Sequence, residues 1–234
     1  PVDLHLKGLE KLGAKIKIEH GYIIAKAKKL TGATIVFDKI SLGATINVML
    51  AATMADGTTI LKNASKEPEV IDTINFLNAI GANVHGAGTD TLTITGVKKL
   101  NGIDSYSVIP DRIEAATLIA AAVITNGNVT VERLKPEQLT LFFEKLKDTG
   151  SKFNIENSRV FIYPYKNRLK SVDIITEPYP GFPTDVQAQW MALMSIATGR
   201  TIIKETIWEN RFMHAFELGR MGADIKIDGN TAII

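Results

Sequence analysis

The sequence predicts an α/β protein built from a repeated unit of strand, helix, strand, helix, strand and strand, with about three and a half copies present. A Gly that closes a helix before a short strand recurs at intervals of 68, 69 and 72 residues, at Gly13, Gly81, Gly150 and Gly222. An earlier Gly, between an Ala-rich segment and a β-branched run, recurs at Gly57, Gly127 and Gly199. No such Gly precedes Gly13, so we expect the first copy to lack its first half.

The second copy shows the elements in order. Residues 44–55 form an apolar, Ala-rich run that predicts a buried helix, and residues 58–61 after Gly57 predict a strand. An amphipathic helix follows, with an apolar face formed by Val70, Ile71, Ile74, Leu77 and Ile80. Residues 82–85 and 91–94 alternate apolar and polar side chains around a Gly-containing turn, which predicts a hairpin.

The later copies repeat this pattern. The third has a helical stripe of Leu139, Phe142, Phe143 and Leu146, and a hairpin of residues 152–155 and 159–163. The fourth ends in a hairpin of residues 224–227 and 231–234. Each unit should form a mixed sheet, with the Ala-rich helices inside and the amphipathic helices outside. Since no Gly- or Ser-rich linker occurs, we place a compact domain boundary between residues 1–109 and 110–234.

Composition excludes several classes of protein. The 234 residues are 45% hydrophobic and carry 27 basic and 25 acidic side chains, mixed along the chain, so we expect no nucleic-acid partner. The apolar stretches are too short to cross a bilayer and residues 1–20 lack the regions of a signal peptide, so we expect no membrane and a cytoplasmic location. There is no Cys and the four His are far apart, so we expect no metal site.

A proline-rich loop leads into the buried helix of the fourth copy. It reads Glu177-Pro178-Tyr179-Pro180-Gly181-Phe182-Pro183-Thr184-Asp185, and its prolines restrict the direction of the chain. Thr184 fits a helix N-cap and Asp185 the first turn, and this capping pair alone would explain both residues. The functional interpretation is that a carboxylate on a rigid loop serves as a general base or a substrate anchor.

Two further loops lead into helix N-termini, where backbone amide groups attract anions. The segment 209–214 carries Arg211 and His214, which fit either a ligand site or a solvated helix start. The segment 38–45 enters a helix through Ser41 and Gly43, which suit a phosphate but are also ordinary cap residues.

Six segments, in order along essentially the whole chain, carry a family resemblance. They are Pro1-Val2-Asp3-Leu4-His5-Leu6, Asp38-Lys39-x-Ser41-x-Gly43-Ala44-Thr45, Glu67-Pro68-Glu69, Pro110-Asp111-Arg112-Ile113-Glu114, Phe182-Pro183-Thr184-Asp185-x-Gln187-Ala188-Gln189 and Glu209-Asn210-Arg211-Phe212-Met213-His214. Together they resemble the UDP-N-acetylglucosamine 1-carboxyvinyltransferases, which are enolpyruvyl transferases.

The resemblance implies an inside-out α/β barrel of the enolpyruvyl transferase type, with two domains of three units each and a substrate cleft between them. Residues 1–109 would hold the end of one unit and one whole unit of the first domain, and residues 110–234 two whole units of the second. The family transfers the enolpyruvyl group of phosphoenolpyruvate to the 3-hydroxyl of UDP-N-acetylglucosamine and releases phosphate, in peptidoglycan synthesis. It needs no metal or organic cofactor.

The resemblance also implies roles for individual residues. Asp185 matches the carboxylate that takes the proton of the sugar hydroxyl, and Ile207 lies where the backbone meets the same sugar. The segments that would hold the uridine and the diphosphate contain Pro1, Val2, Asp3, Leu4, Lys39, Ile40, Ser41, Leu42 and Gly43. Glu67 and Arg211 are further candidate substrate-binding residues.

Other parts of the family pattern are absent from the sequence. The resemblance implies a general-acid Cys on a mobile loop upstream and arginines downstream that grip phosphoenolpyruvate. We therefore expect the chain to need the missing N- and C-terminal parts of the same enzyme and to be inactive alone. One alternative is a non-catalytic paralogue that binds the nucleotide sugar without releasing phosphate. The other is a structural repeat scaffold, in which Asp185→Asn would change neither binding nor activity.

Overall fold

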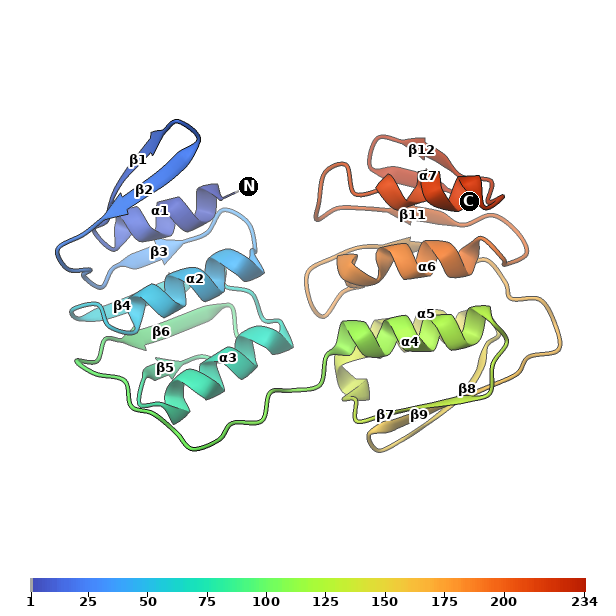
Figure 1. Cartoon of the computed structure of the whole chain (residues 1–234), viewed down its shortest axis with the longest axis horizontal. Helices are drawn as coiled ribbons and strands as arrows, with labels where there is room; N and C mark the ends of the chain where they lie inside the picture. Colours follow the sequence, from blue (N-terminus) through green and yellow to red (C-terminus); the bar gives the residue numbers. More distant parts are fainter. Residues whose placement is uncertain (1) are drawn as a thin grey trace. The chain divides into compact units, whose positions relative to one another are not determined.

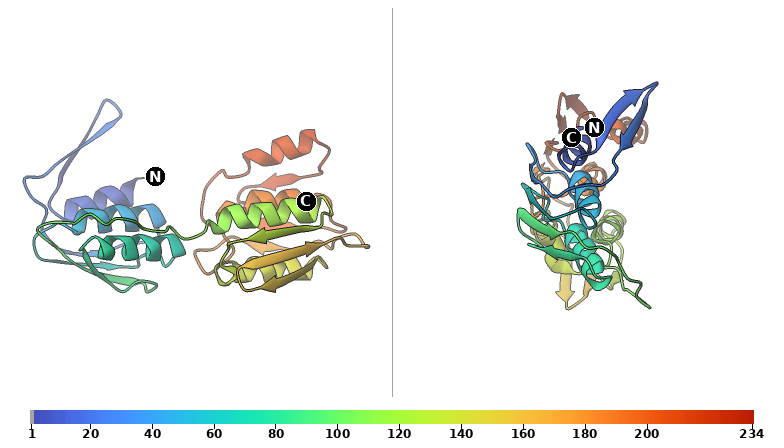
Figure 2. Two further views of the ribbon diagram at one scale, coloured as in Figure 1. Left: turned by 60° about the horizontal axis from the view of Figure 1, so that its bottom comes forward. Right: turned by 90° about the vertical axis from the view of Figure 1, so that its left-hand side faces the viewer.

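The computed structural model describes residues 2–234, which form two compact units. One unit ends at Ile109 and the other runs from Pro110 to Ile234, and each is described by itself. Figure 1 shows the order of the elements, and Figure 2 shows the same ribbon from two further sides.

The first unit contains the expected six-element copy. Its sheet has the order β3-β4-β6-β5, in which β3 and β4 are parallel and the remaining pairs antiparallel. Helices α1, α2 and α3 lie side by side in one layer (Figures 1 and 2). The strands β1 and β2 form a separate two-stranded antiparallel hairpin. The elements are α1 (Asp3–Lys11), β1 (Lys15–Glu19), β2 (Tyr22–Lys26), β3 (Thr34–Val36), α2 (Leu42–Ala52), β4 (Thr58–Lys62), α3 (Pro68–Ala79), β5 (Asn83–His85) and β6 (Thr91–Thr95).

The second unit repeats this topology. Its sheet β10-β11-β13-β12 has the order and strand directions of β3-β4-β6-β5. A three-stranded sheet, β7-β9-β8, shows the same order without the first strand. The elements are α4 (Arg112–Ile124), β7 (Val129–Glu132), η1 (Pro136–Leu139), α5 (Thr140–Asp148), β8 (Lys152–Glu156), β9 (Arg159–Tyr163), β10 (Ile174–Ile175), η2 (Thr184–Val186), α6 (Gln187–Met194), β11 (Ile202–Lys204), α7 (Met213–Arg220), β12 (Lys226–Asp228) and β13 (Thr231–Ile233).

The third copy lacks the first strand that the repeat predicts, because the segment before Pro110 is bound to α3 instead. Tyr106 Oη shares its one proton between two oxygens of Asp72, Oδ1 at 2.8 Å and the carbonyl oxygen at 3.0 Å. The Tyr106 ring also packs edge-to-face on Phe76, with centroids 5.2 Å apart. Pro110 has no backbone N–H to donate to a sheet.

The four Gly residues that mark the repeat directly follow the C-cap residues of their helices and end these helices, as predicted. Gly13, Gly81, Gly150 and Gly222 have φ values of 99°, 96°, 83° and 101°, a left-handed conformation that a side chain disfavours. In three copies the next residue donates to the carbonyl five residues earlier, which is the long hydrogen bond of the Schellman motif. These bonds are Ala14 to Leu9, Ala82 to Leu77 and Ala223 to Leu218.

Each unit has its own apolar core. The helical stripes predicted for α3 and α5 face these cores, with Val70, Ile74, Leu77, Phe142 and Leu146 all buried. The Ala-rich helices are interior on one side only. Leu50 of α2 is 46% exposed and Leu118 of α4 is 50% exposed, so one stripe of each helix remains at the surface.

Candidate functional site

The proline-rich loop is anchored to the core of the second unit by Phe182. Its side chain is fully buried, and its ring centroid lies 5.5 Å from that of Trp190 and 6.3 Å from that of Phe142. Trp190 is itself fixed by a hydrogen bond of 3.1 Å from its indole N–H to the carbonyl of Val172. Buried aromatic pairs contribute about 0.5–1.5 kcal/mol each beyond the burial of their surface. The loop therefore enters α6 from a fixed position.

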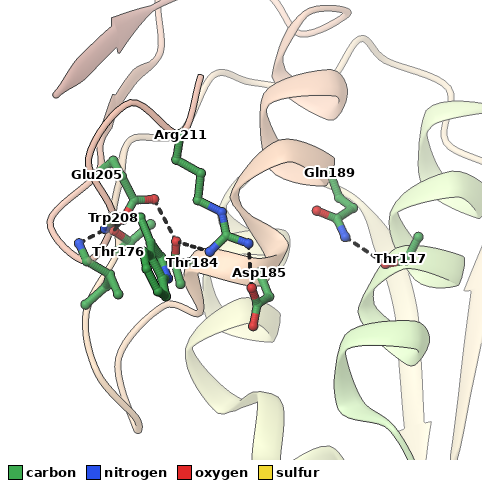
Figure 3. A network of polar contacts seen from close by, with 9 residues as sticks. Thr117, Thr176, Thr184, Asp185, Gln189, Glu205, Trp208 and Arg211 are labelled. Carbon is green, nitrogen blue, oxygen red and sulfur yellow. Dashed lines mark hydrogen bonds and ion pairs between the residues drawn. The ribbon is translucent and has the colours of Figure 1, made fainter. Parts of the chain in front are cut away.

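Thr184 does not cap the helix that follows, so this half of the capping prediction is wrong, whereas Asp185 does lie in the first turn of η2. Pro183 occupies the N-cap position of η2, and no side chain caps the backbone there. Thr184 Oγ1 instead donates to Glu205 Oε2 at 2.8 Å and accepts from Arg211 Nη1 at 3.0 Å (Figure 3). A hydroxyl has one proton and two lone pairs, so it can make both bonds at once.

Asp185 and Arg211, two of the predicted site residues, form an ion pair. Arg211 Nη2 donates to Asp185 Oδ1 at 2.6 Å. The side chain of Arg211 is 36% exposed and that of Asp185 is 52% exposed. Within residues 2–234, Asp185 Oδ2 accepts no hydrogen bond. A carboxylate with one oxygen fixed and the other accessible suits the acceptance of a proton from a bound hydroxyl.

Glu205 is a member of this site that the sequence analysis missed. It follows β11 directly and is 2% exposed. Its Oε1 accepts from Thr176 Oγ1 at 2.8 Å and from the backbone N–H groups of Ile207 and Trp208, at 2.8 and 3.1 Å. Its Oε2 accepts from Thr184. An acid directly after an apolar strand is the only signal in the sequence, and it is a weak one because such a position is usually solvated.

Ile207 lies in the loop that follows Glu205, and His214 lies in the first turn of α7. The N–H of Ile207 is bound to Glu205, so only its carbonyl remains to meet a ligand. Burial, and to a lesser extent the charge of Arg211, lower the pKa of His214. Its Nε2 is buried and has no hydrogen-bond partner in the part of the chain that the structure describes. Arg211 and His214 are therefore more enclosed than a solvated helix start would be.

Helix α6 is also tied to α4. Gln189 Nε2 donates to Thr117 Oγ1 at 2.8 Å, as Figure 3 shows. The backbone that carries Asp185 is thus held by a contact before it in the chain, from Phe182, and by one after it, from Gln189.

The first unit gathers a second group of predicted residues around the N-terminal turns of α1 and α2. Val2 precedes α1, and Asp3 and Leu4 lie in its first turn, where the Leu4 side chain is buried in the core. Ser41 caps α2, its Oγ accepting from a backbone N–H of the first turn at 3.3 Å. Two such N-termini direct backbone amide groups outward, an arrangement that favours an anion.

Gly43 allows the two helices to approach. A Cβ at this position would lie 3.3 Å from Cε1 of His5 on α1, a closer contact than side chains ordinarily make. His5 Nδ1 is also within hydrogen-bond distance of the Asn47 amide of α2, at 2.9 Å. The N-terminal turns of α1 and α2 are therefore packed together.

The remaining predicted residues of the first unit lie in the loop before α2, at the start of α2 and at the start of α3. Lys39 is exposed in the loop before α2, and Ile40 and Leu42 are partly buried on either side of Ser41. Glu67 occupies the N-cap position of α3 with an extended backbone. Pro1 lies outside the described residues.

Residues 2–234 contain no cluster of three or more His, Cys, Asp or Glu side chains that could hold a metal ion. Over the same residues, every helix falls short of the length and apolar character that crossing a membrane requires.

Residues 1–234 match the family model of EPSP synthase (3-phosphoshikimate 1-carboxyvinyltransferase). The chain is 54% identical over its whole length to UDP-N-acetylglucosamine 1-carboxyvinyltransferase 1 of Caldanaerobacter subterraneus subsp. tengcongensis. It is 53% and 50% identical to the UDP-N-acetylglucosamine 1-carboxyvinyltransferases of Clostridium botulinum and Klebsiella pneumoniae. It spans 56% of the length of each of these three relatives.

Solved structures share the fold. The whole chain superimposes on 58% of the enolpyruvyl transferase NikO from Streptomyces tendae, with a TM-score of 0.90 and 25% identity. It also superimposes on 56% of an EPSP synthase from Acinetobacter baumannii, with a TM-score of 0.70 and 23% identity. The topology is therefore that of enolpyruvyl transferases, although the sheets of the described residues remain open.

Proposed function

The chain belongs to the EPSP synthase (3-phosphoshikimate 1-carboxyvinyltransferase) family, and on this premise we propose that it is part of an enzyme of peptidoglycan synthesis. The enzyme transfers the enolpyruvyl group of phosphoenolpyruvate to the 3-hydroxyl of UDP-N-acetylglucosamine and releases phosphate. The names of the relatives at 50–54% identity support this choice of substrates. The proposal needs no metal or organic cofactor, and the cytoplasmic location expected from the sequence is part of it.

The observation that carries the proposal is the fixed carboxylate of Asp185. The oxygen of the sugar hydroxyl forms a bond to C2 of phosphoenolpyruvate, its proton passes to Asp185 Oδ2, and C3 receives a proton from a general acid. Loss of phosphate and of a proton from C3 then restores the double bond. Arg211 holds Oδ1 at 2.6 Å and so orients Oδ2 for the first of these transfers.

In this proposal, residues of the first unit bind the nucleotide. The capped start of α2 and the first turn of α1 offer backbone amides, and Lys39 adds a cation for the diphosphate. Gly43 permits a close approach of the ligand to the backbone. Glu67, at the start of α3, completes this group of proposed substrate-binding residues.

The test uses the complete gene product that contains this chain, with phosphate release measured in the presence of both substrates. Asp185→Asn keeps the size of the side chain but removes its basicity, so kcat should fall by about 100-fold or more. Asp228→Asn, on an exposed hairpin of the same unit, is the control and should leave kcat unchanged. Wild-type turnover by Asp185→Asn would contradict the role of Asp185.

The acceptor is tested separately, because the family model is named for a different one. Replacing UDP-N-acetylglucosamine by 3-phosphoshikimate should abolish phosphate release. Phosphate release with 3-phosphoshikimate as acceptor, and none with UDP-N-acetylglucosamine, would assign the chain to the other substrate class. Binding of the nucleotide sugar without phosphate release by the complete protein would favour the non-catalytic paralogue.

A further inference from the structure

Glu205 joins three segments of the second unit that meet near Asp185. Its Oε1 holds the ends of β10 and β11 together, through Thr176 and the N–H groups of residues 207 and 208. Its Oε2 makes one contact, to Thr184 in the proline-rich loop. The two oxygens of one carboxylate thus serve different parts of the structure.

Comparison with the second copy shows which of these contacts the joining of the strand ends requires. Phe37 donates its N–H to the carbonyl of Lys62 in the second copy, as Thr176 does to Lys204 in the fourth, so these positions correspond. The residue after Lys62 is Asn63, whose amide donates to the carbonyl of Phe37 at 3.0 Å. There the backbone bond from Phe37 and one side-chain bond from the Asn63 amide tie the two strand ends together. The second oxygen of Glu205, and its bond to Thr184, go beyond this structural need.

The bond to Thr184 begins a chain of hydrogen bonds whose direction is fixed. Arg211 can only donate and an ionised carboxylate can only accept, so Thr184 must give its proton to Glu205 and offer a lone pair to Arg211. The second arm of the same guanidinium reaches Asp185 Oδ1. We infer that Glu205 is a positioning residue for Asp185, acting through Thr184 and Arg211 to orient the carboxylate that accepts the proton. This inference rests on the proposed function.

Glu205→Gln tests the inference with little change of volume. Three donors converge on Oε1, so the amide oxygen of Gln takes that place and its NH₂ group faces Thr184. An NH₂ group cannot accept the hydroxyl proton, so the Thr184 hydroxyl loses its acceptor and is no longer held with a lone pair toward Arg211. In the complete gene product kcat should fall by about tenfold, with KM for UDP-N-acetylglucosamine within about twofold of wild type.

Substitutions at Thr184 and a remote acid provide the matched comparisons. Thr184→Val removes the hydroxyl and should lower kcat by a similar factor, whereas Thr184→Ser retains the hydroxyl and should keep kcat near the wild-type value. Asp173→Asn alters a different acid, directly before β10, whose Oδ1 accepts from the N–H of Ile202 at 2.7 Å, and should leave kcat unchanged. A loss of kcat in Asp173→Asn equal to that in Glu205→Gln would show that any disturbance of the sheet has this effect, and would overturn the inference.

A double-mutant cycle distinguishes positioning from general stability. If Glu205 acts through Asp185, adding Glu205→Gln to Asp185→Asn should change kcat by less than about twofold. The positioning role alone would be overturned if Glu205→Gln lowered kcat equally in the wild-type and the Asp185→Asn protein. It would also be overturned if Glu205→Gln kept wild-type kcat while Asp185→Asn was impaired. Wild-type kcat in Asp185→Asn would instead overturn the proposed function of Asp185.

A second measurement needs no activity. In a crystal structure of the Glu205→Gln protein, Arg211 Nη2 should have moved out of hydrogen-bond distance of Asp185 Oδ1. A pair that stays at 2.6 Å, as in the wild-type chain, would overturn the inference.

Discussion

Replacing Arg211 by Lys should lower turnover far more than stability. Arg211 uses two nitrogens, Nη1 toward Thr184 at 3.0 Å and Nη2 toward Asp185 at 2.6 Å. Lys keeps the positive charge but carries a single nitrogen at the end of a flexible chain, so it cannot hold both partners. The variant therefore removes the geometry of the pair while retaining its charge.

The expected loss of stability follows from the solvent exposure of the ion pair, and the expected loss of kcat from its geometry. The side chains of Arg211 and Asp185 are 36% and 52% exposed, and ion pairs this accessible to solvent contribute about 0.2–1 kcal/mol to stability. Since Lys retains one of the two contacts, the free energy of unfolding should fall by no more than about 1 kcal/mol, and Tm should fall by only a few degrees. Misplacing a catalytic group by about 1 Å costs up to about 100-fold in rate, so kcat should fall by about tenfold to 100-fold.

Calorimetry and phosphate release on the complete gene product measure the two effects separately. Arg220→Lys is the matched control, because Arg220 pairs with Glu217 at 2.9 Å on the exposed side of α7, away from Asp185. It should change neither Tm nor kcat appreciably. Wild-type kcat in Arg211→Lys would refute the orienting role of the guanidinium. A loss of stability above about 3 kcal/mol would show instead that Arg211 is chiefly structural.

Two further predictions concern packing and pH. Gly8→Ala would place a Cβ 2.2 Å from Cγ2 of Val48, so urea denaturation should show a loss of about 1–3 kcal/mol, whereas Gly102→Ala, with no atom within 4 Å, should show almost none. Burial, followed by the charge of Arg211, lowers the pKa of His214, so the folded state favours the neutral ring and stability should fall as pH drops below about 6.5. His214→Gln should remove this part of the pH dependence of Tm, and an unchanged dependence would contradict the assignment.

The repeat could be predicted from the sequence because local physics determines it. Helices commonly end at a Gly that adopts a left-handed φ, and Gly13, Gly81, Gly150 and Gly222 all do so. The alternation around the turn at residues 86–90 likewise produced the expected hairpin of β5 and β6. The missing first strand of the third copy was not predictable in this way, because Tyr106 binds Asp72, a residue 34 positions away.

The site was predictable only in part. Asp185 and Arg211 were selected from the sequence, but their pairing depends on two loops that are 26 residues apart along the chain. Thr184 matched a capping pattern, yet its hydroxyl is bound to Glu205 and Arg211 because these charged partners outcompete the backbone amides. Glu205 has no motif at all. Its importance arises from four donors that converge only in the folded chain.

The position of the sugar hydroxyl relative to Asp185 tests the central claim most directly. We would determine the crystal structure of the complete gene product with UDP-N-acetylglucosamine bound. The 3-hydroxyl should lie within about 2.6–3.2 Å of Asp185 Oδ2, while Arg211 still holds Oδ1. A nucleotide sugar bound with its 3-hydroxyl away from Asp185, or facing a different carboxylate, would contradict the account.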